Sequence, residues 1–225
     1  IELSAIETEG SFSGVYFLGV PLHLRAIPND GYLFSSWSGS LPATEEVVTT
    51  PLGNFNATAF FTQTGGGAEI VINEIQYKPA RIADSGDWIE LFNKSHQAAT
   101  LDGWELRDEN SSFAFPAGTT IQPGEYLVLC SDLAAFTAQF PTVTNVIGEL
   151  GFGLSGNGER IELHATDGIH DSVEYDDSAP WPTGPDGSGT TLELIIADAD
   201  NSFSAAWDES NVLGGTPGQK NTVSP

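Results

Sequence analysis

Residues 87–94 read Asp-Trp-Ile-Glu-Leu-Phe-Asn-Lys, and within this run Ile89 and Leu91 alternate with the charged Glu90. A period of two places Ile89 and Leu91 on one face of an extended chain and Glu90 on the other face. That pattern is typical of a strand in a sheet with one solvated face. The run therefore predicts a β-strand whose apolar side belongs to a core.

Six further runs repeat this pattern, separated by turn-forming clusters of Gly, Pro, Asn and Asp. They are residues 69–77, 100–108, 124–132, 158–166, 168–176 and 190–196. The alternates expected in the core are Trp104 and Leu106, Leu127 and Leu129, Ile161 and Leu163, and Leu192 and Leu194; those expected to face solvent are Glu105, Glu162 and Glu193. Seven strands in about 150 residues favour a β-sandwich. One helix is expected, capped by Ser131, running over residues 132–140 and ended by Pro141.

Residues 64–67 read Thr-Gly-Gly-Gly and divide the chain, because a glycine run has no side chains to pack and behaves as a flexible coil. Before this linker, alternation over residues 19–28 and the runs 31–39, 47–50 and 56–61 predict four short strands. We therefore expect an all-β chain, with a small β-rich domain at 1–63 and a larger β-sandwich at 68–225.

The first domain carries an ordered set of Tyr, Gly, Pro and aromatic positions, including a Gly-Tyr-x-Phe-x-x-Trp-x-Gly run. The set is Tyr16, Gly19, Leu24, Ala26, Pro28, Gly31, Tyr32, Phe34, Trp37, Gly39, Ala59 and Phe60. This order resembles the internalin B-repeat-like bacterial repeat over residues 1–63. The resemblance implies a small spacer or adhesion repeat of bacterial surface proteins.

The second domain contains seven blocks that resemble the lamin-tail domain in order over residues 69–221. They are Val71-Ile72-Asn73-Glu74-Ile75, residues 87–93, Leu101-Asp102-Gly103-Trp104-Glu105-Leu106, residues 115–119, residues 124–128, Asp171-Ser172-Val173, and Gly215-Thr216-Pro217-Gly218 with Asn221. The resemblance implies an immunoglobulin-like sandwich of the bacterial secreted type, which serves as a non-catalytic interaction module. The basic residues associated with nuclear lamin tails are absent, so a nuclear role is not implied.

The net charge limits which partners can bind. The chain contains 31 Asp and Glu but only 7 Lys and Arg, so its net charge is −24. Nucleic acid is not an expected partner, since binding it needs clustered basic residues that displace counterions. The same reasoning disfavours an anionic membrane, and no apolar run is long enough to predict membrane insertion. A strong net charge also favours a monomer.

No pattern in the chain predicts catalysis. Gly151 to Gly156 match G-x-G-x-x-G, but a strand follows them where a dinucleotide site requires a helix. The four histidines accompany no nucleophile elbow, and they form no closely spaced metal-ligand pair with the single Cys130. We therefore expect no enzyme activity and no bound cofactor.

Two local features remain as candidate sites. Trp181, between two prolines, is the best candidate for an exposed aromatic that binds a ligand, although packing in the core is the favoured interpretation. Asp198, Asp200 and Asn201 place oxygen ligands in one loop and make calcium possible. The favoured alternative is that these residues form turns by bonding their own backbone.

The expected function is that of an interaction and spacer module within a larger bacterial secreted or cell-surface protein. Its partner is expected to be a protein or a glycan at the cell surface. The alternative is a carbohydrate-binding or substrate-targeting accessory domain of an extracellular enzyme.

Overall fold

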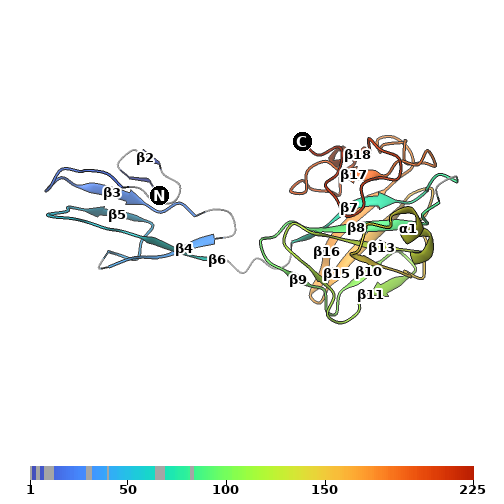
Figure 1. Ribbon diagram of the computed structural model, residues 1–225, viewed down its shortest axis with the longest axis horizontal. Helices are drawn as coiled ribbons and strands as arrows, with labels where there is room; N and C mark the ends of the chain where they lie inside the picture. Colours follow the sequence, from blue (N-terminus) through green and yellow to red (C-terminus); the bar gives the residue numbers. More distant parts are fainter. Residues whose placement is uncertain are drawn as a thin grey trace. The chain divides into compact units, whose positions relative to one another are not determined.

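The computed structural model describes residues 2–3, 6–7, 13–28, 32–39, 41–63, 69–81 and 84–225. The chain divides into two compact units, Ile1–Gly66 and Gly67–Pro225, each with a hydrophobic core of its own (Figure 1). The glycine linker expected at residues 64–67 lies outside the described residues.

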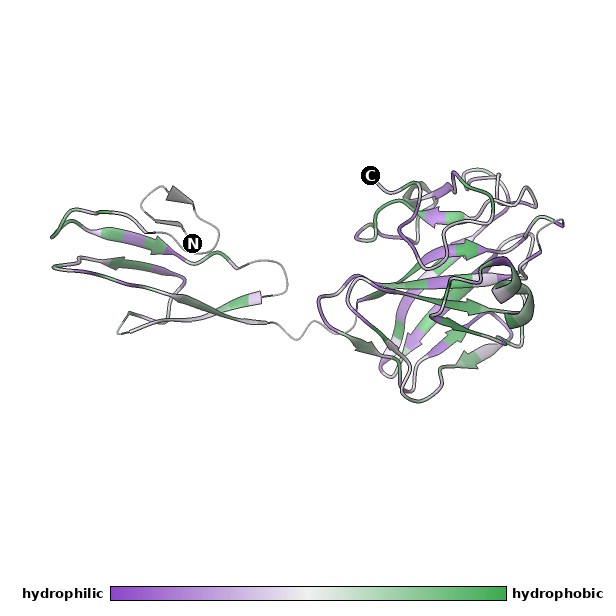
Figure 2. Cartoon of the chain, viewed as in Figure 1, coloured by the Kyte–Doolittle hydropathy of each residue, from purple (hydrophilic) through white to green (hydrophobic). Residues whose placement is uncertain are grey.

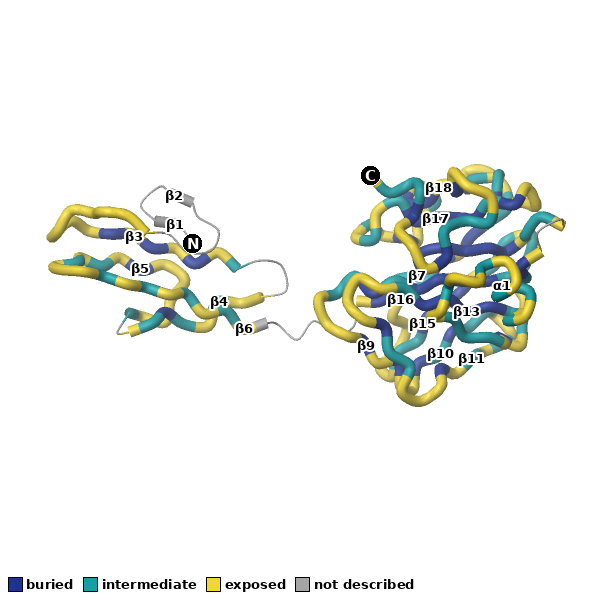
Figure 3. Tube along the Cα trace, viewed as in Figure 1, coloured by how far each residue is buried: buried dark blue, intermediate teal, exposed yellow. Residues whose placement is uncertain are grey.

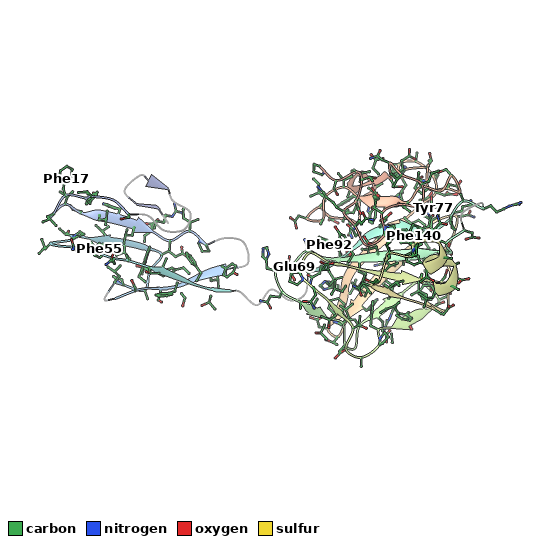
Figure 4. The ribbon with its side chains drawn as sticks, viewed as in Figure 1. Phe17, Phe55, Glu69, Tyr77, Phe92 and Phe140 are labelled. Carbon is green, nitrogen blue, oxygen red and sulfur yellow. The ribbon has the colours of Figure 1, made fainter. Side chains whose placement is uncertain are left out.

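The first unit consists of short antiparallel strands. One sheet has the order β2-β1-β3-β5 and contains β1 (Glu2–Leu3), β2 (Ile6–Glu7), β3 (Leu22–Arg25) and β5 (Glu46–Thr49). A second sheet pairs β4 (Tyr32–Trp37) with β6 (Ala59–Gln63). The small core contains Leu22, Leu24, Ala26, Trp37 and Val47. Much of the unit is exposed (Figure 3), and Phe17 points away from its strands (Figure 4).

The second unit contains a six-stranded sheet in the order β14-β13-β8-β7-β17-β18. Its strands are β7 (Ile70–Gln76), β8 (Trp88–Asn93), β13 (Tyr126–Cys130), β14 (Val146–Ile147), β17 (Leu192–Leu194) and β18 (Trp207–Glu209). All neighbours are antiparallel except β13 and β14. A short 3₁₀ turn, Ser204–Ala206, leads into β18.

A four-stranded antiparallel sheet in the order β11-β10-β15-β16 faces the first. It contains β10 (Glu105–Arg107), β11 (Ser112–Ala114), β15 (Glu159–Ala165) and β16 (Gly168–Tyr175). A separate pair joins β9 (Ala99–Thr100) to β12 (Thr120–Ile121). The seven runs expected to be extended all contain strands, and the short β9, β11, β12, β14 and β18 are additional.

One core lies between the two sheets of this unit. It combines Ile89, Leu91, Leu127, Leu129, Leu192 and Leu194 from the six-stranded sheet with Leu106, Ile161, Leu163 and Val173 from the four-stranded sheet. Hydrophobic and hydrophilic colours alternate along these strands (Figure 2). The apolar alternates predicted from the sequence are therefore confirmed as core residues, and the unit is a β-sandwich.

The outer face of the six-stranded sheet is not solvated, contrary to the expectation from the sequence. Glu90 and Glu193 were expected to face water, but both are fully buried. Helix α1 (Leu133–Gln139) covers one part of this face, where Trp88 packs against Phe136. Residues 211–225, which we call the C-terminal strap, cover the part that holds the glutamates. The expectation was wrong because a third layer lies over the sheet.

The predicted helix is present, but its cap is Asp132 and not Ser131. The Asp132 side chain accepts a hydrogen bond from the Ala135 backbone N–H at 2.9 Å, and the helix ends before Phe140. Asp132 takes the role because its carboxylate reaches a free N–H of the first turn. Within the described ranges, no helix is long and apolar enough to cross a membrane.

Candidate functional site

Three glutamates lie side by side on neighbouring strands of the six-stranded sheet. Glu74 of β7 is in register with Glu90 of β8 and with Glu193 of β17. Residues paired in this way project from the same face, with Cβ atoms about 4.5–5.5 Å apart. All three are fully buried, and no ion pair of the described part of the chain involves them. We call this group the glutamate cluster.

The Glu74 carboxyl group accepts hydrogen bonds from Thr191 and from the strap residue Thr216. The Thr191 hydroxyl and the Thr216 backbone N–H both donate to Oε1, at 2.5 and 2.9 Å. The Thr216 hydroxyl lies 3.3 Å from Oε2 of Glu74 and 2.8 Å from Oε1 of Glu193. A single strap residue therefore bridges two of the three buried side chains.

Glu90 and Glu193 are also bonded by the strap. The Gly218 N–H donates to Glu90 Oε2 at 2.5 Å, and the Thr222 hydroxyl and Val223 N–H donate to Glu193 Oε2 at 2.7 and 3.1 Å. Strap residue Asn221 exchanges hydrogen bonds with the buried Asn73, whose amide in turn donates to Glu90 Oε1 at 2.9 Å. The cluster is thus enclosed by donors and has no opening for a substrate.

Burial changes the pKa of Glu74 and Glu90. It raises the pKa of Glu74 well above the ordinary value, and the neighbouring Glu90 adds to the shift. Burial also raises the pKa of Glu90 to about 8, against the hydrogen bonds from Gly218 and Asn73, which lower it. Carboxyl groups of this kind retain protons at pH values at which exposed glutamates are ionised.

Cys130 is placed unfavourably for nucleophilic chemistry. Its side chain is buried beneath α1, and burial raises the pKa of the thiol to about 11, with Glu149 and Asp132 adding to the shift. Because the thiolate is the reactive form, a raised pKa suppresses reactivity. The residue packs as a small apolar side chain.

An open hollow of about 560 Å³ lies on the solvent-facing side of the four-stranded sheet. The β10–β11 turn and β15 form it, and its lining is Glu105, Arg107, Asp108, Glu109, Asn110, Ser111, Ser112, Arg160 and Glu162. Two of the seven basic residues of the chain therefore lie in one hollow, among four acidic residues. The hollow is a candidate site for a polar, charged ligand.

Ion pairs hold the side chains of this hollow in place. Arg107 Nη2 lies 2.7 Å from Glu105 Oε2, and Arg160 Nη2 lies 2.8 Å from Glu162 Oε1. The other oxygen of Glu162 lies 2.6 Å from His164 Nε2. Paired side chains lose less freedom when a ligand binds, so the hollow is partly preorganised. The sequence carried a signal for it: acidic and basic residues alternate on both β10 and β15.

Trp181 lies in the core of the second unit, with 9% of its surface exposed, and its ring centre is 6.3 Å from that of Trp207. This position agrees with the packing interpretation that the sequence favoured. A ligand has little of this side chain to contact.

The structure separates the three residues that made calcium possible. Asp198 is exposed and pairs with Lys94 at 3.1 Å, whereas Asp200 bonds the backbone N–H and hydroxyl of Ser202. Asn201 turns inward, and its amide donates to Asp171 Oδ2 at 2.8 Å. Among the described residues, no group of three or more His, Cys, Asp or Glu is arranged to hold a metal ion.

We expect millimolar calcium to leave the melting temperature of the chain unchanged relative to chelator, because the three side chains already have separate partners. Differential scanning calorimetry in calcium and in EDTA measures this. A stabilisation of about 2.7 kcal/mol, the value for a ligand at a hundredfold excess over Kd, would contradict the prediction. Loss of that stabilisation in Asp200→Ala would place the ion in this loop.

A family model of the Lamin Tail Domain matches residues 63–177, just over half of the chain. The chain belongs to the lamin tail domain family. A model of the divergent InlB B-repeat domain matches residues 4–65, so both resemblances expected from the sequence, and their order, are confirmed. Both are non-catalytic types of domain. The sandwich of the second unit is immunoglobulin-like, as in this family.

No curated protein matches the chain. One solved structure, a DUF4876 family protein from Bacteroides thetaiotaomicron, is 9% identical, with 75% of this chain and 74% of that chain covered and a TM-score of 0.46. At that score the likeness carries no argument about function.

The lamin tail match ends at residue 177, before β17 and the strap. Glu193 and every strap donor therefore lie beyond the matched residues, although they complete the buried cluster with Glu74 and Glu90. In this chain the lamin tail domain is closed by residues outside the part that the family model describes.

Proposed function

We propose that this chain is a non-catalytic interaction and spacer module of a larger bacterial secreted or cell-surface protein. The lamin tail and B-repeat domains support an accessory role, and B-repeat and immunoglobulin-like domains are typical of bacterial surface proteins. The observation that carries the proposal is the contrast between two groups of carboxylates. The glutamate cluster is sealed and saturated, whereas the charged hollow on the opposite sheet is open.

The ligand that best fits the hollow is a basic segment of another protein. Four carboxylates against two guanidinium groups give the lining a net negative charge, and the whole chain carries −24. Such a field accelerates the approach of a cationic partner. No aromatic residue lines the hollow, so a sugar ring has no stacking surface there. The burial of Trp181 removes the feature that had supported the carbohydrate-binding alternative.

We expect Glu109→Lys to weaken binding of a fluorescently labelled oligolysine peptide about tenfold at low salt. Glu109 is an exposed member of the lining, and the substitution replaces an attraction with a repulsion. Fluorescence anisotropy at several salt concentrations measures the affinity, which is expected to fall as salt rises.

Asp167→Lys is the matched control, because it makes the same change of charge at the β15–β16 turn. Asp167 lies five residues along the chain from Glu162, the lining residue nearest to it on this strand, roughly 16 Å at the rise of a strand. Equal weakening by both substitutions would show a general charge effect and overturn the assignment of the hollow. Binding to soluble polysaccharides in preference to the peptide would support the carbohydrate-binding alternative.

A further inference from the structure

The strap is the only layer of protein that the described contacts place over the glutamate cluster. It donates to all three carboxyl groups, through Thr216, Gly218, Thr222 and Val223. Within the strap itself, the backbone N–H and the side-chain amide of Asn211 both donate hydrogen bonds to Thr222. The hydrogen bonds of the cluster and the seating of the strap are therefore one set of interactions.

The contacts of Thr216 favour a proton in the cluster. Its hydroxyl lies within hydrogen-bond distance of both Glu74 and Glu193, but a hydroxyl has only one hydrogen to donate. The second contact is a hydrogen bond only if that carboxyl group is protonated and donates to the hydroxyl oxygen. With both glutamates ionised, two carboxylate oxygens would compete for one hydrogen in a site closed to water.

We propose that the C-terminal strap is a pH-sensitive latch, seated on the glutamate cluster while the cluster holds a proton and released as the cluster ionises. Ionisation places negative charges on adjacent strands in register, and the single hydrogen of the Thr216 hydroxyl cannot bond both Glu74 and Glu193. Release of the strap admits water and relieves this repulsion.

Three other titratable side chains of the described residues lie near the cluster or on the strap: Tyr126, Asp208 and Lys220. Tyr126 of β13 lies near Glu74 and Glu90, and burial raises the pKa of its hydroxyl to about 12, so it stays neutral. Asp208 of β18 is in register with Glu193, but it is exposed and bonds the Glu209 N–H. On the strap, Lys220 donates to the carbonyl of Pro225. None of these contacts supplies a cation to the cluster.

The direction of the pH effect follows from the carboxyl groups. Burial raises the pKa of Glu74 and Glu90 in the seated state, whereas release of the strap exposes them and restores ordinary values near 4.3. At any pH between the ordinary pKa of these carboxyl groups and their raised pKa, the seated state therefore holds more protons than the released state. Each retained proton increases the released population up to about tenfold per pH unit as pH rises, until the seated groups themselves ionise.

Tryptic cleavage after Lys220 measures release in the full chain. Lys220 is the only Lys or Arg after Arg160, and its peptide bond joins it to Asn221, which is buried. The cleavage rate is divided by that of a free peptide with the sequence of residues 211–225, which removes the pH dependence of trypsin. We expect the ratio to rise between pH 6 and 9, by up to about tenfold per unit.

Glu74→Gln tests the role of the proton. Its amide oxygen keeps the acceptor position for Thr191 and the Thr216 N–H, and its amide nitrogen donates to the Thr216 hydroxyl, as a protonated carboxyl group does. We expect a shallower pH dependence in this variant. Glu174→Gln, at an exposed position on β16, is the control and is expected to retain the wild-type slope.

Three results would overturn the proposal: a wild-type ratio that does not change with pH, an equal slope in Glu74→Gln, or cleavage after Arg107 and Arg160 that keeps pace with cleavage after Lys220. The last result would show unfolding of the whole unit. If Glu74→Gln does not fold, carbon-13 NMR titration of the wild-type chain decides, because carboxyl midpoints near 4.3 for Glu74 and Glu90 would exclude a retained proton.

Discussion

Gly215→Ala is expected to destabilise the second unit by about 3–5 kcal/mol, a large part of the stability of an ordinary domain. A Cβ atom at this position would lie 1.9 Å from Glu74 Oε1 and 2.6 Å from the Thr191 hydroxyl, on a backbone with φ +72°. The strained φ costs about 1–2 kcal/mol in a residue other than glycine. Displacing the strap also removes donors from buried carboxyl groups, at about 1–3 kcal/mol for each unsatisfied group.

Gly214→Ala provides the control one residue earlier. It has a similar φ of +85°, but its Cβ would meet only the ring of Phe140, at 3.3 Å. We therefore expect only the backbone cost of about 1–2 kcal/mol for this variant. Urea denaturation followed by tryptophan fluorescence measures both. If the two variants lose equal stability, the close approach of Gly215 to Glu74 does not add to the stability of the second unit.

The contrast between Ile89 and Glu90 shows how far the sequence predicted this fold. Alternation identified the inner face of β8 correctly, because Ile89 and Leu91 are fully buried in the core between the sheets. Alternation failed on the outer face, because it predicted that Glu90 would face solvent. A signal was present: Trp88 and Phe92 flank Glu90 at a spacing of two, so both faces of this strand carry large apolar side chains. Such a strand is typical of a sheet covered on both sides.

The glutamate cluster itself was beyond the reach of local patterns. Glu74 and Glu193 are 119 residues apart in the chain, and only strand order and register bring them into one cluster. The strap partners come from still further along the sequence, and the Gly-Thr-Pro-Gly run at 215–218 was useful only as part of a family resemblance. Alternation predicts which way a side chain points, but it does not predict which segment covers it.

The turn residue Asp200 illustrates the opposite case, in which a local explanation was sufficient. Asp200 bonds Ser202 two residues ahead, which is the ordinary role of Asp in a turn. The hollow was not predicted, because ion pairs such as Arg107 with Glu105 acquire a shared surface only when β10 and β15 are placed together.

The free energy of unfolding of the second unit is expected to fall as pH rises from about 5 to 8. Burial raises the pKa of Glu90 to about 8, that of Asp87 to about 6 and that of Glu74 well above its ordinary value. In the unfolded chain these groups lose their protons near pH 4. The folded state therefore binds more protons than the unfolded state in this range, and each retained proton lowers stability by about 1.4 kcal/mol per pH unit.

One proton retained from pH 5 to pH 8 corresponds to a loss of about 4 kcal/mol. His170 acts in the opposite sense, because burial lowers its pKa, but this side chain is partly exposed and affects only the range below its ordinary value of 6.5. The carboxyl groups are therefore expected to determine whether the free energy of unfolding rises or falls with pH. Urea denaturation at pH 5, 6, 7 and 8 measures the slope.

Self-repulsion of a chain with a charge of −24 would also weaken the fold as pH rises, and salt distinguishes the two causes. At 1 M salt the Debye length is about 3 Å, so repulsion between exposed charges is screened, whereas buried groups are screened much less. We expect most of the slope to survive at high salt and to decrease in Glu74→Gln. A slope that disappears at high salt would assign the pH dependence to the surface and leave the buried carboxyl groups with ordinary proton affinities.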